Sequence, residues 1–128
     1  MLDLEKVRIL GNVIDDSFNF GKASSRHGQE SISCSLQGDV LTLKFVEIVH
    51  FASERSLQDQ TRLLASESME KITNRLDLIK KQFKENGGGT LRFEELSNRD
   101  DIELISATSN SPRKIAYYRR NIAVKLDA

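Results

Sequence analysis

The sequence predicts an α+β fold in which a mainly antiparallel sheet of about five strands carries one long helix packed across a face. One long segment has apolar residues at helical spacing, and several shorter segments alternate apolar with polar residues, as half-buried strands do. Glycines, polar clusters and the single proline fall between these segments. We expect a single domain, 1–128, comprising an N-terminal segment and arm-like loop (1–28), a hairpin (29–51), the long helix (53–86) and C-terminal strands (90–126).

The N-terminal segment is apolar without a clean period. Leu4, Val7 and Ile14 would share one face of a helix. Val7, Ile9 and Val13 would instead share one face of a strand. Both alternatives remain open, and we favour the strand.

A loop is expected from Ser17 to Gly28, where turn-forming residues follow one another without a core pattern. A loop of about eleven residues is often an arm or a contact element.

A β-hairpin is predicted next, because serines alternate with apolar residues over Ser31–Leu36 and apolar residues alternate with polar ones over Leu41–Phe45. Gln37–Asp39 supplies the turn. The alternation fails over Val46–Phe51, which predicts either a β-bulge or burial on both faces of the strand.

The long helix is the best bounded element. Ser53 or Ser56 can cap its start, and Asn86 followed by the glycines of Gly87–Gly89 can end it. Apolar residues recur at alternating steps of four and three, which places them in one stripe that must be covered. This helix core stripe comprises Ala65, Met69, Ile72, Leu76, Ile79 and Phe83.

The length of this helix leaves two alternatives open. About 33 residues at 1.5 Å each extend about 50 Å, whereas a compact chain of this size has a diameter of about 35–40 Å. A straight helix would therefore overhang its own domain. Either it frays or bends away near Ser66–Ser68, or it projects and is buried by another subunit.

The C-terminal part is predicted to contain two or three strands. Leu91–Glu94 forms a short strand, Leu96–Asp101 a polar turn and Ile102–Ile105 a further strand. Turn-forming residues fill Ser106–Pro112, and Lys114–Leu126 is the last strand.

The composition excludes some classes of function. Nineteen basic and nineteen acidic side chains cancel, which removes the overall positive field of a general nucleic-acid binder. The single cysteine, Cys34, cannot form an internal disulfide and fits a reducing compartment. Met1–Asp16 carries charges among its apolar residues, so we predict neither a signal peptide nor a membrane span. We expect a soluble protein made inside a cell.

No set of residues predicts catalysis or metal binding. His27 and His50 lie far apart, without further ligands at zinc spacing. Cys34 lies within an alternating strand pattern. Gly21–Ser24 is similar to the end of a phosphate-binding loop, but Asp16 occupies the position of the required earlier glycine. We therefore expect no catalytic residues, no metal ligands, no cofactor and no small-molecule substrate.

The most suggestive surface is Tyr117–Arg120. On a strand, each face would present one tyrosine beside one arginine. Such pairs anchor protein interfaces and also stack on the bases of single-stranded nucleic acid. The zero net charge favours a protein partner. The predicted interface residues are Arg26, His27, Arg113, Lys114, Tyr117, Tyr118, Arg119 and Arg120.

Two segments, Ser25-Arg26-His27-Gly28-Gln29-Glu30-Ser31-Ile32-Ser33 and Leu104–Asn121, resemble parts of small virion proteins of tailed phages of the T4-like myovirus kind. The resemblance implies a repeated building block of a capsid, neck, tail or baseplate, made in the host cytoplasm and located in the virion. Its partners would be copies of itself and other virion proteins. It implies no site residue.

The combined expectation is a non-enzymatic structural or assembly protein that forms a homo-oligomeric ring or lattice. The alternative is a nucleic-acid-binding accessory protein that uses Tyr117, Tyr118, Arg119 and Arg120.

Overall fold

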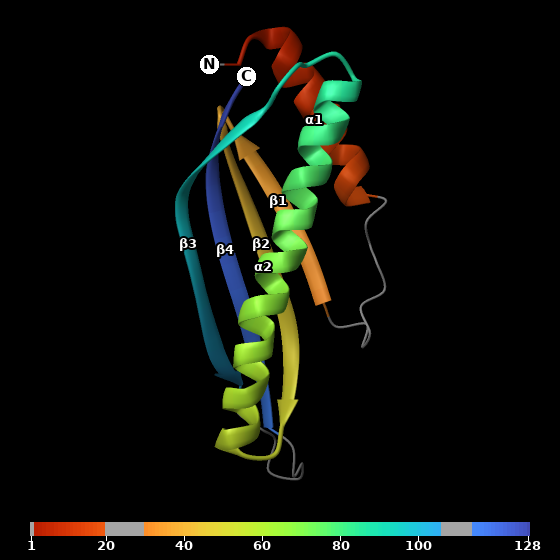
Figure 1. The fold of residues 1–128 in the computed structure, drawn as a ribbon. Coiled ribbons are helices and arrows are strands. Elements are labelled where there is room, and N and C mark those ends of the chain that lie inside the picture. Colours follow the sequence, from red (N-terminus) through yellow and green to blue (C-terminus); the bar gives the residue numbers. More distant parts are fainter. Residues whose placement is uncertain (1, 20–29, 106–113) are drawn as a thin grey trace.

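The computed structural model describes residues 2–19, 30–105 and 114–128, which form two helices and four strands (Figure 1). The fold is α+β, with an antiparallel sheet and one long helix, as the sequence predicts. In chain order the elements are α1 (Leu4–Asn19), β1 (Glu30–Gln37), β2 (Val40–Phe51), α2 (Glu54–Glu85), β3 (Arg92–Ile105) and β4 (Lys114–Asp127).

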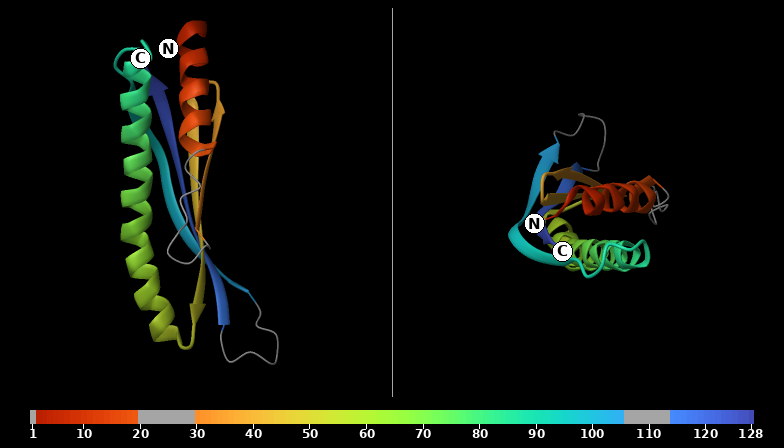
Figure 2. Two further views of the ribbon diagram at one scale, coloured as in Figure 1. Left: turned by 90° about the vertical axis from the view of Figure 1, so that its right-hand side faces the viewer. Right: turned by 90° about the horizontal axis from the view of Figure 1, so that it is seen from above.

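The sheet has the order β1-β2-β4-β3, and every neighbouring pair is antiparallel. Both helices lie on the same side of it (Figure 2). The hydrophobic core fills the space between this inner face and the helices, and neither of the two described helices lies on the other face. The core is made by alternate residues of the two central strands, such as Leu43 and Phe45 on β2 and Ile122 and Val124 on β4.

The prediction of about five strands is wrong for the described residues, because β3 is one strand where two strands and a turn were expected. The polar segment Leu96–Asp101 continues β3 and pairs with β4 throughout. A register shift between Glu95 and Ser97 accommodates Leu96 as an extra residue. β3 is an edge strand, and most of its side chains are exposed. Its backbone pairing therefore outweighs a sequence that is typical of a turn.

The favoured strand at the N-terminus is also wrong, since residues 4–19 form α1. The buried helical face differs from the one expected: Leu4 is 90% exposed, whereas Leu10 and Val13 are buried. Asp3 begins the helix by accepting a hydrogen bond from the backbone N–H of Lys6 at 2.9 Å. The helix continues to Asn19, so the expected loop starts later than Ser17, and the rest of that loop lies outside the described residues.

The hairpin prediction is confirmed. Gly38 and Asp39 connect β1 to β2, and Gly38 has a φ of +62°, which glycine adopts without strain. β2 continues to Phe51 with unbroken pairing to β4, so the predicted bulge is wrong. The alternative, burial on both faces, fits better: Val49 is buried on the inner face and Ile48 is half-buried on the outer face.

The bounds of α2 agree with the prediction. Ser53 caps the helix by accepting a hydrogen bond from the Ser56 backbone N–H at 3.1 Å, and Asn86 is the C-cap. The predicted stripe faces the sheet: Ile72, Ile79 and Phe83 are buried, and Ala65, Met69 and Leu76 are half-buried.

The expected overhang of this helix is wrong. α2 is continuous over 32 residues and lies along the length of the sheet (Figures 1 and 2). β3 and β4 have 14 residues each, which corresponds to about 45 Å, and a helix of this length extends about 48 Å. The molecule is elongated, so the compact-sphere estimate does not apply. The inward face of α2 is covered by its own chain, although Leu63 on another face is 63% exposed.

We predict opposite effects of alanine at two glycines. A Cβ on Gly88 would lie 2.5 Å from the ring of the fully buried Phe83, so Gly88→Ala should lower the free energy of unfolding by about 1–3 kcal/mol. A Cβ on Gly11 in α1 would meet nothing within 4 Å, so Gly11→Ala should raise the free energy of unfolding by about 0.5–1 kcal/mol. Urea unfolding measures both, and equal effects would contradict the packing described for Phe83.

Candidate functional site

The segment Tyr117–Arg120 runs along β4, and its side chains alternate between the two faces of the sheet. Tyr118 and Arg120 point inward beneath α2, where they are 0% and 8% exposed. Tyr117 and Arg119 lie on the outer face and are half-buried. The segment thus contributes to two different environments.

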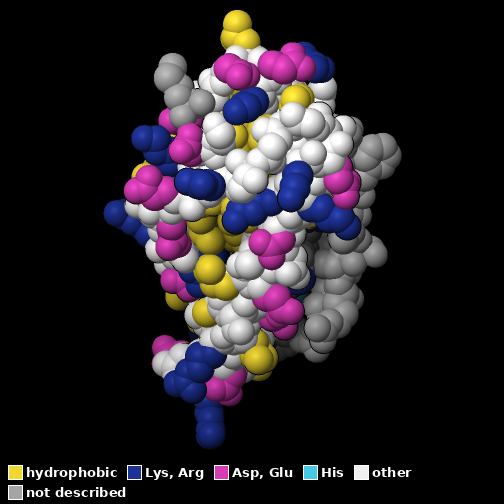
Figure 3. Space-filling model, turned by 45° about the horizontal axis from the view of Figure 1, so that its top comes forward, with side chains coloured by type: hydrophobic (Ala, Val, Ile, Leu, Met, Phe, Trp, Pro, Cys, Tyr) yellow, Lys and Arg dark blue, Asp and Glu magenta, His cyan; other side chains and the backbone are white. Residues whose placement is uncertain are grey.

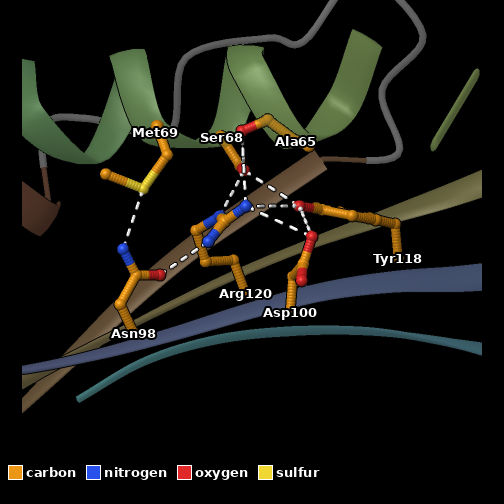
Figure 4. Close-up of polar contacts among 7 residues, drawn as sticks. All are labelled: Ala65, Ser68, Met69, Asn98, Asp100, Tyr118 and Arg120. Carbon is orange, nitrogen blue, oxygen red and sulfur yellow. Dashed lines mark hydrogen bonds and ion pairs between the residues drawn. The ribbon is translucent and has the colours of Figure 1, made fainter. Parts of the chain in front are cut away.

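Arg120 is the centre of a polar network between α2 and the sheet (Figure 4). Its Nε donates a hydrogen bond to Ser68 Oγ at 2.8 Å, and its Nη1 donates to Asn98 Oδ1 at 2.6 Å. Its Nη2 lies 3.2 Å from Asp100 Oδ2 and 3.4 Å from the Ala65 carbonyl oxygen. The guanidinium therefore bonds α2 and β3 simultaneously.

Tyr118 completes the network. Its hydroxyl donates to Asp100 Oδ2 at 3.0 Å and accepts a hydrogen bond from Arg120 Nη2 at 3.2 Å. Ser68 Oγ lies 3.2 Å from the same hydroxyl. The ring packs edge-on against Phe45 with centroids 6.1 Å apart. Burial raises the pKa of Tyr118, because desolvation disfavours the phenolate.

We call this network the clamp, because it joins α2 to β3 and β4. No buried side-chain nitrogen or oxygen in the described part of the chain lacks a hydrogen-bond partner. The Asp100 carboxylate is held by Arg120 and Tyr118, with its side chain 40% exposed. As predicted interface residues, Tyr118 and Arg120 are wrong, because they are buried within their own chain.

Sequence reasoning missed Ser68, which is fully buried at the centre of the clamp. The available signal was its spacing. Leu64, Ser68 and Ile72 follow one another at steps of four on the buried side of α2, so the serine occupies a core position. A polar residue there requires a buried partner.

On the outer face, Arg119 is bound to acidic residues of β3. Its Nε and Nη2 donate to the two carboxylate oxygens of Asp101, each at 3.0 Å, and Nη1 lies 3.1 Å from Glu103. This guanidinium is thus already engaged by two carboxylates.

Beside Arg119 lies a set of half-buried apolar side chains on the helix-free face of the sheet. Tyr117 lies opposite Ile48 of β2 on one side and opposite Glu103 of β3 on the other. We call these apolar residues the outer patch, which comprises Val46, Ile48, Ile105, Ile115 and Tyr117. The predicted interface residue Lys114 is exposed at the start of β4, in register with the buried Phe51 on the inner side of the sheet. Arg26, His27 and Arg113 lie outside the described residues.

The helix-bearing side differs from the outer patch. Acidic and basic side chains are interspersed over it, around a narrow hydrophobic strip (Figure 3). An open groove of about 130 Å³ lies where α1 meets the end of α2, lined by Arg8, Ile9, Asn12, Val13 and Asn86. No group of acidic, cysteine or histidine residues in residues 2–19, 30–105 and 114–128 is arranged to hold a metal ion.

Comparison with known proteins identifies no relative: no family model, no curated protein and no solved structure matches the chain. Neither of the two described helices combines the length and apolar character needed to cross a membrane.

We predict that neighbouring arginines differ strongly in their effect on stability. Arg120→Met leaves Ser68 and Asn98 without their donor, so it should lower the free energy of unfolding by about 2–4 kcal/mol. Arg119→Met removes two ion pairs with exposed carboxylates and should change the free energy of unfolding little. Urea unfolding of both variants is the measurement. A small loss for Arg120→Met would contradict the clamp.

Tyr118→Phe should lower the free energy of unfolding at pH 7 by about 0.5–1.5 kcal/mol through the lost hydrogen bonds. The pKa of Tyr118 is raised above its ordinary value of 10.0, so the folded state retains the proton more strongly than the unfolded state. The resulting stability is fully present below pH 10 and is lost as pH rises through the folded-state pKa.

The wild type should therefore lose more stability than the phenylalanine variant between pH 9.5 and pH 11. Burial also raises the pKa of Cys34, to about 11, but this contribution is common to both proteins and cancels in the comparison. Parallel pH profiles would contradict the buried, hydrogen-bonded phenol.

Proposed function

We propose that this chain is a non-enzymatic structural protein, a subunit of a tailed-phage virion, that binds further copies of itself in a ring or lattice. The observation that carries the proposal is the one-sided architecture. Both helices cover the inner face of the sheet, while the outer patch and the ion-paired Arg119 lie on the face without helices. A half-covered apolar surface beside charged groups is typical of a protein interface.

The clamp supports the non-enzymatic part of the proposal. General acid–base or nucleophilic catalysis needs a group that is free to exchange a proton or attack a substrate. The polar side chains that converge most closely in the described residues are instead bonded to one another around Arg120.

The charges of the outer face favour a second copy as the occupant. Bases and acids both lie on this face, so two copies can place opposite charges against each other. The bases are Lys44, Arg92, Arg99, Arg119 and Lys125, and the acids are Glu94, Asp101, Glu103 and Asp127. A nucleic acid would require an excess of free cations, but Arg119 is already bound by Asp101 and Glu103.

The virion assignment is supported by the resemblance described above. Its longer segment, Leu104–Asn121, contains Ile105, Ile115 and Tyr117 of the outer patch together with Arg119. The portion that resembles phage virion proteins thus supplies much of the surface proposed to bind neighbours.

The test is the molar mass in solution, measured by light scattering on the purified protein at tens of micromolar. We expect oligomers for the wild type. Tyr117→Lys with Ile48→Lys places charges in the outer patch and should reduce the mass. The matched control is Ser97→Lys with Asn121→Lys, which adds the same charge at exposed positions elsewhere on the same face and should leave the mass unchanged.

A wild-type monomer at this concentration would overturn self-assembly. Oligomers that resist the lysines at Tyr117 and Ile48 would exclude the outer patch as the contact.

A further inference from the structure

The two edges of the sheet differ in how they are protected. Within the described residues, β1 and β3 are the edge strands, and no strand pairs with the outer edge of either. β3 has a register shift at Glu95/Ser97 and carries many charges, which are features that prevent an edge from pairing with another chain. Its charged residues are Arg92, Glu94, Glu95, Arg99, Asp100, Asp101 and Glu103.

β1 has none of these protective features. Its sequence from Ser31 to Gln37 contains no charged residue and no proline, and its pairing with β2 is regular over the whole strand. Serines occupy the exposed positions, while Ile32, Cys34 and Leu36 are half-buried and pack against the core. Within the described residues, β1 is therefore an unprotected edge.

The hairpin fixes which backbone groups this edge presents. Gln37 and Val40 flank the two-residue turn, so they form a hydrogen-bonded pair, and the pairs then alternate along the strands. In the next pair, Leu36 points its own N–H and C=O away from β2, and Cys34 and Ile32 do the same. Three evenly spaced residues thus offer both a donor and an acceptor to a further strand.

We propose that β1 pairs with β1 of a second copy, antiparallel, about a two-fold axis at Cys34, so that the two four-stranded sheets become one. This inference rests on the self-assembly proposed above and adds a second contact, separate from the outer patch.

The strand is complementary to itself in this register. Ile32 lies opposite Leu36 of the second copy, Ser33 lies opposite Ser35, and the two Cys34 residues lie opposite each other. Apolar residues therefore meet on the inner face, and serine hydroxyls meet on the outer face. A strand of another sequence would need the same alternation and neutrality, which a second copy supplies by symmetry.

Cross-linking through Cys34 provides the first test. A hydrogen-bonded antiparallel pair has Cα atoms about 5.5 Å apart, which lies within disulfide range. Oxidation with copper phenanthroline, or treatment with a short bismaleimide, should give a covalent dimer on a non-reducing gel. The control Cys34→Ser with Ser97→Cys moves the thiol to an exposed position on β3 and should give little dimer.

The second test places charges on β1 and measures the dissociation constant of self-association by sedimentation or light scattering. Ser33→Lys with Ser35→Lys sets like charges opposite each other at two points and should weaken association at least tenfold. Ser33→Lys with Ser35→Glu makes the same number of substitutions in the same strand, but sets opposite charges together and should restore association. Thermal unfolding should show that both variants are folded, since both positions are exposed.

The outcomes separate the two proposals. If the wild type is oligomeric but gives no Cys34 cross-link, and both charge variants associate alike, the β1 contact is overturned while self-assembly stands. If the wild type is monomeric, both proposals fail. Cross-linking together with charge-dependent association establishes the two-fold β1 pair.

Discussion

The buried guanidinium of Arg120 sets the strongest constraint on this fold. A charged group that is 8% exposed is tolerated only when its donors are bonded, and its partners come from α2, β3 and β4 itself. Ser68 can meet Arg120 only in one placement of the helix, and Asn98 and Asp100 only in one register of β3. The clamp thus fixes the position of the longest helix and of the most polar strand together.

This constraint accounts for the stability of β3 as a strand. Asn98–Asp101 is a poor strand sequence, yet Asn98 and Asp100 direct their side chains into the clamp, and Asp101 holds Arg119 on the opposite face. The polar residues of this segment therefore point in turn to the inner and the outer face of the sheet. The polarity that is typical of a turn here provides hydrogen-bond partners for two arginines.

The elements that were predictable from the sequence are those whose local pattern agrees with their final environment. α2 has a clear stripe and caps, and the β1–β2 hairpin alternates around a glycine turn. α1 and β3 were not predictable in this way. In α1 the apolar residues Leu4 and Val7 are exposed, and in β3 a polar sequence is paired as a strand. For the candidate site, alternation correctly separated Tyr117 and Arg119 from Tyr118 and Arg120, and the spacing of Ser68 marked a core position on α2. Nothing local indicated that Ser68 and Asp100 would both meet the second pair.

The clamp also determines which surfaces remain for assembly. The clamp binds α2 to the inner face of the sheet, so the apolar stripe of α2 is covered by its own chain (Figure 1). The helix therefore does not need a second copy to cover this stripe. What remains is the outer patch and the neutral edge of β1, which lie on different parts of the sheet. One two-fold contact can only close a dimer, whereas two different contacts on one subunit can alternate from copy to copy. Used together, the two surfaces can therefore build a ring or lattice, and no described helix or strand covers either of them.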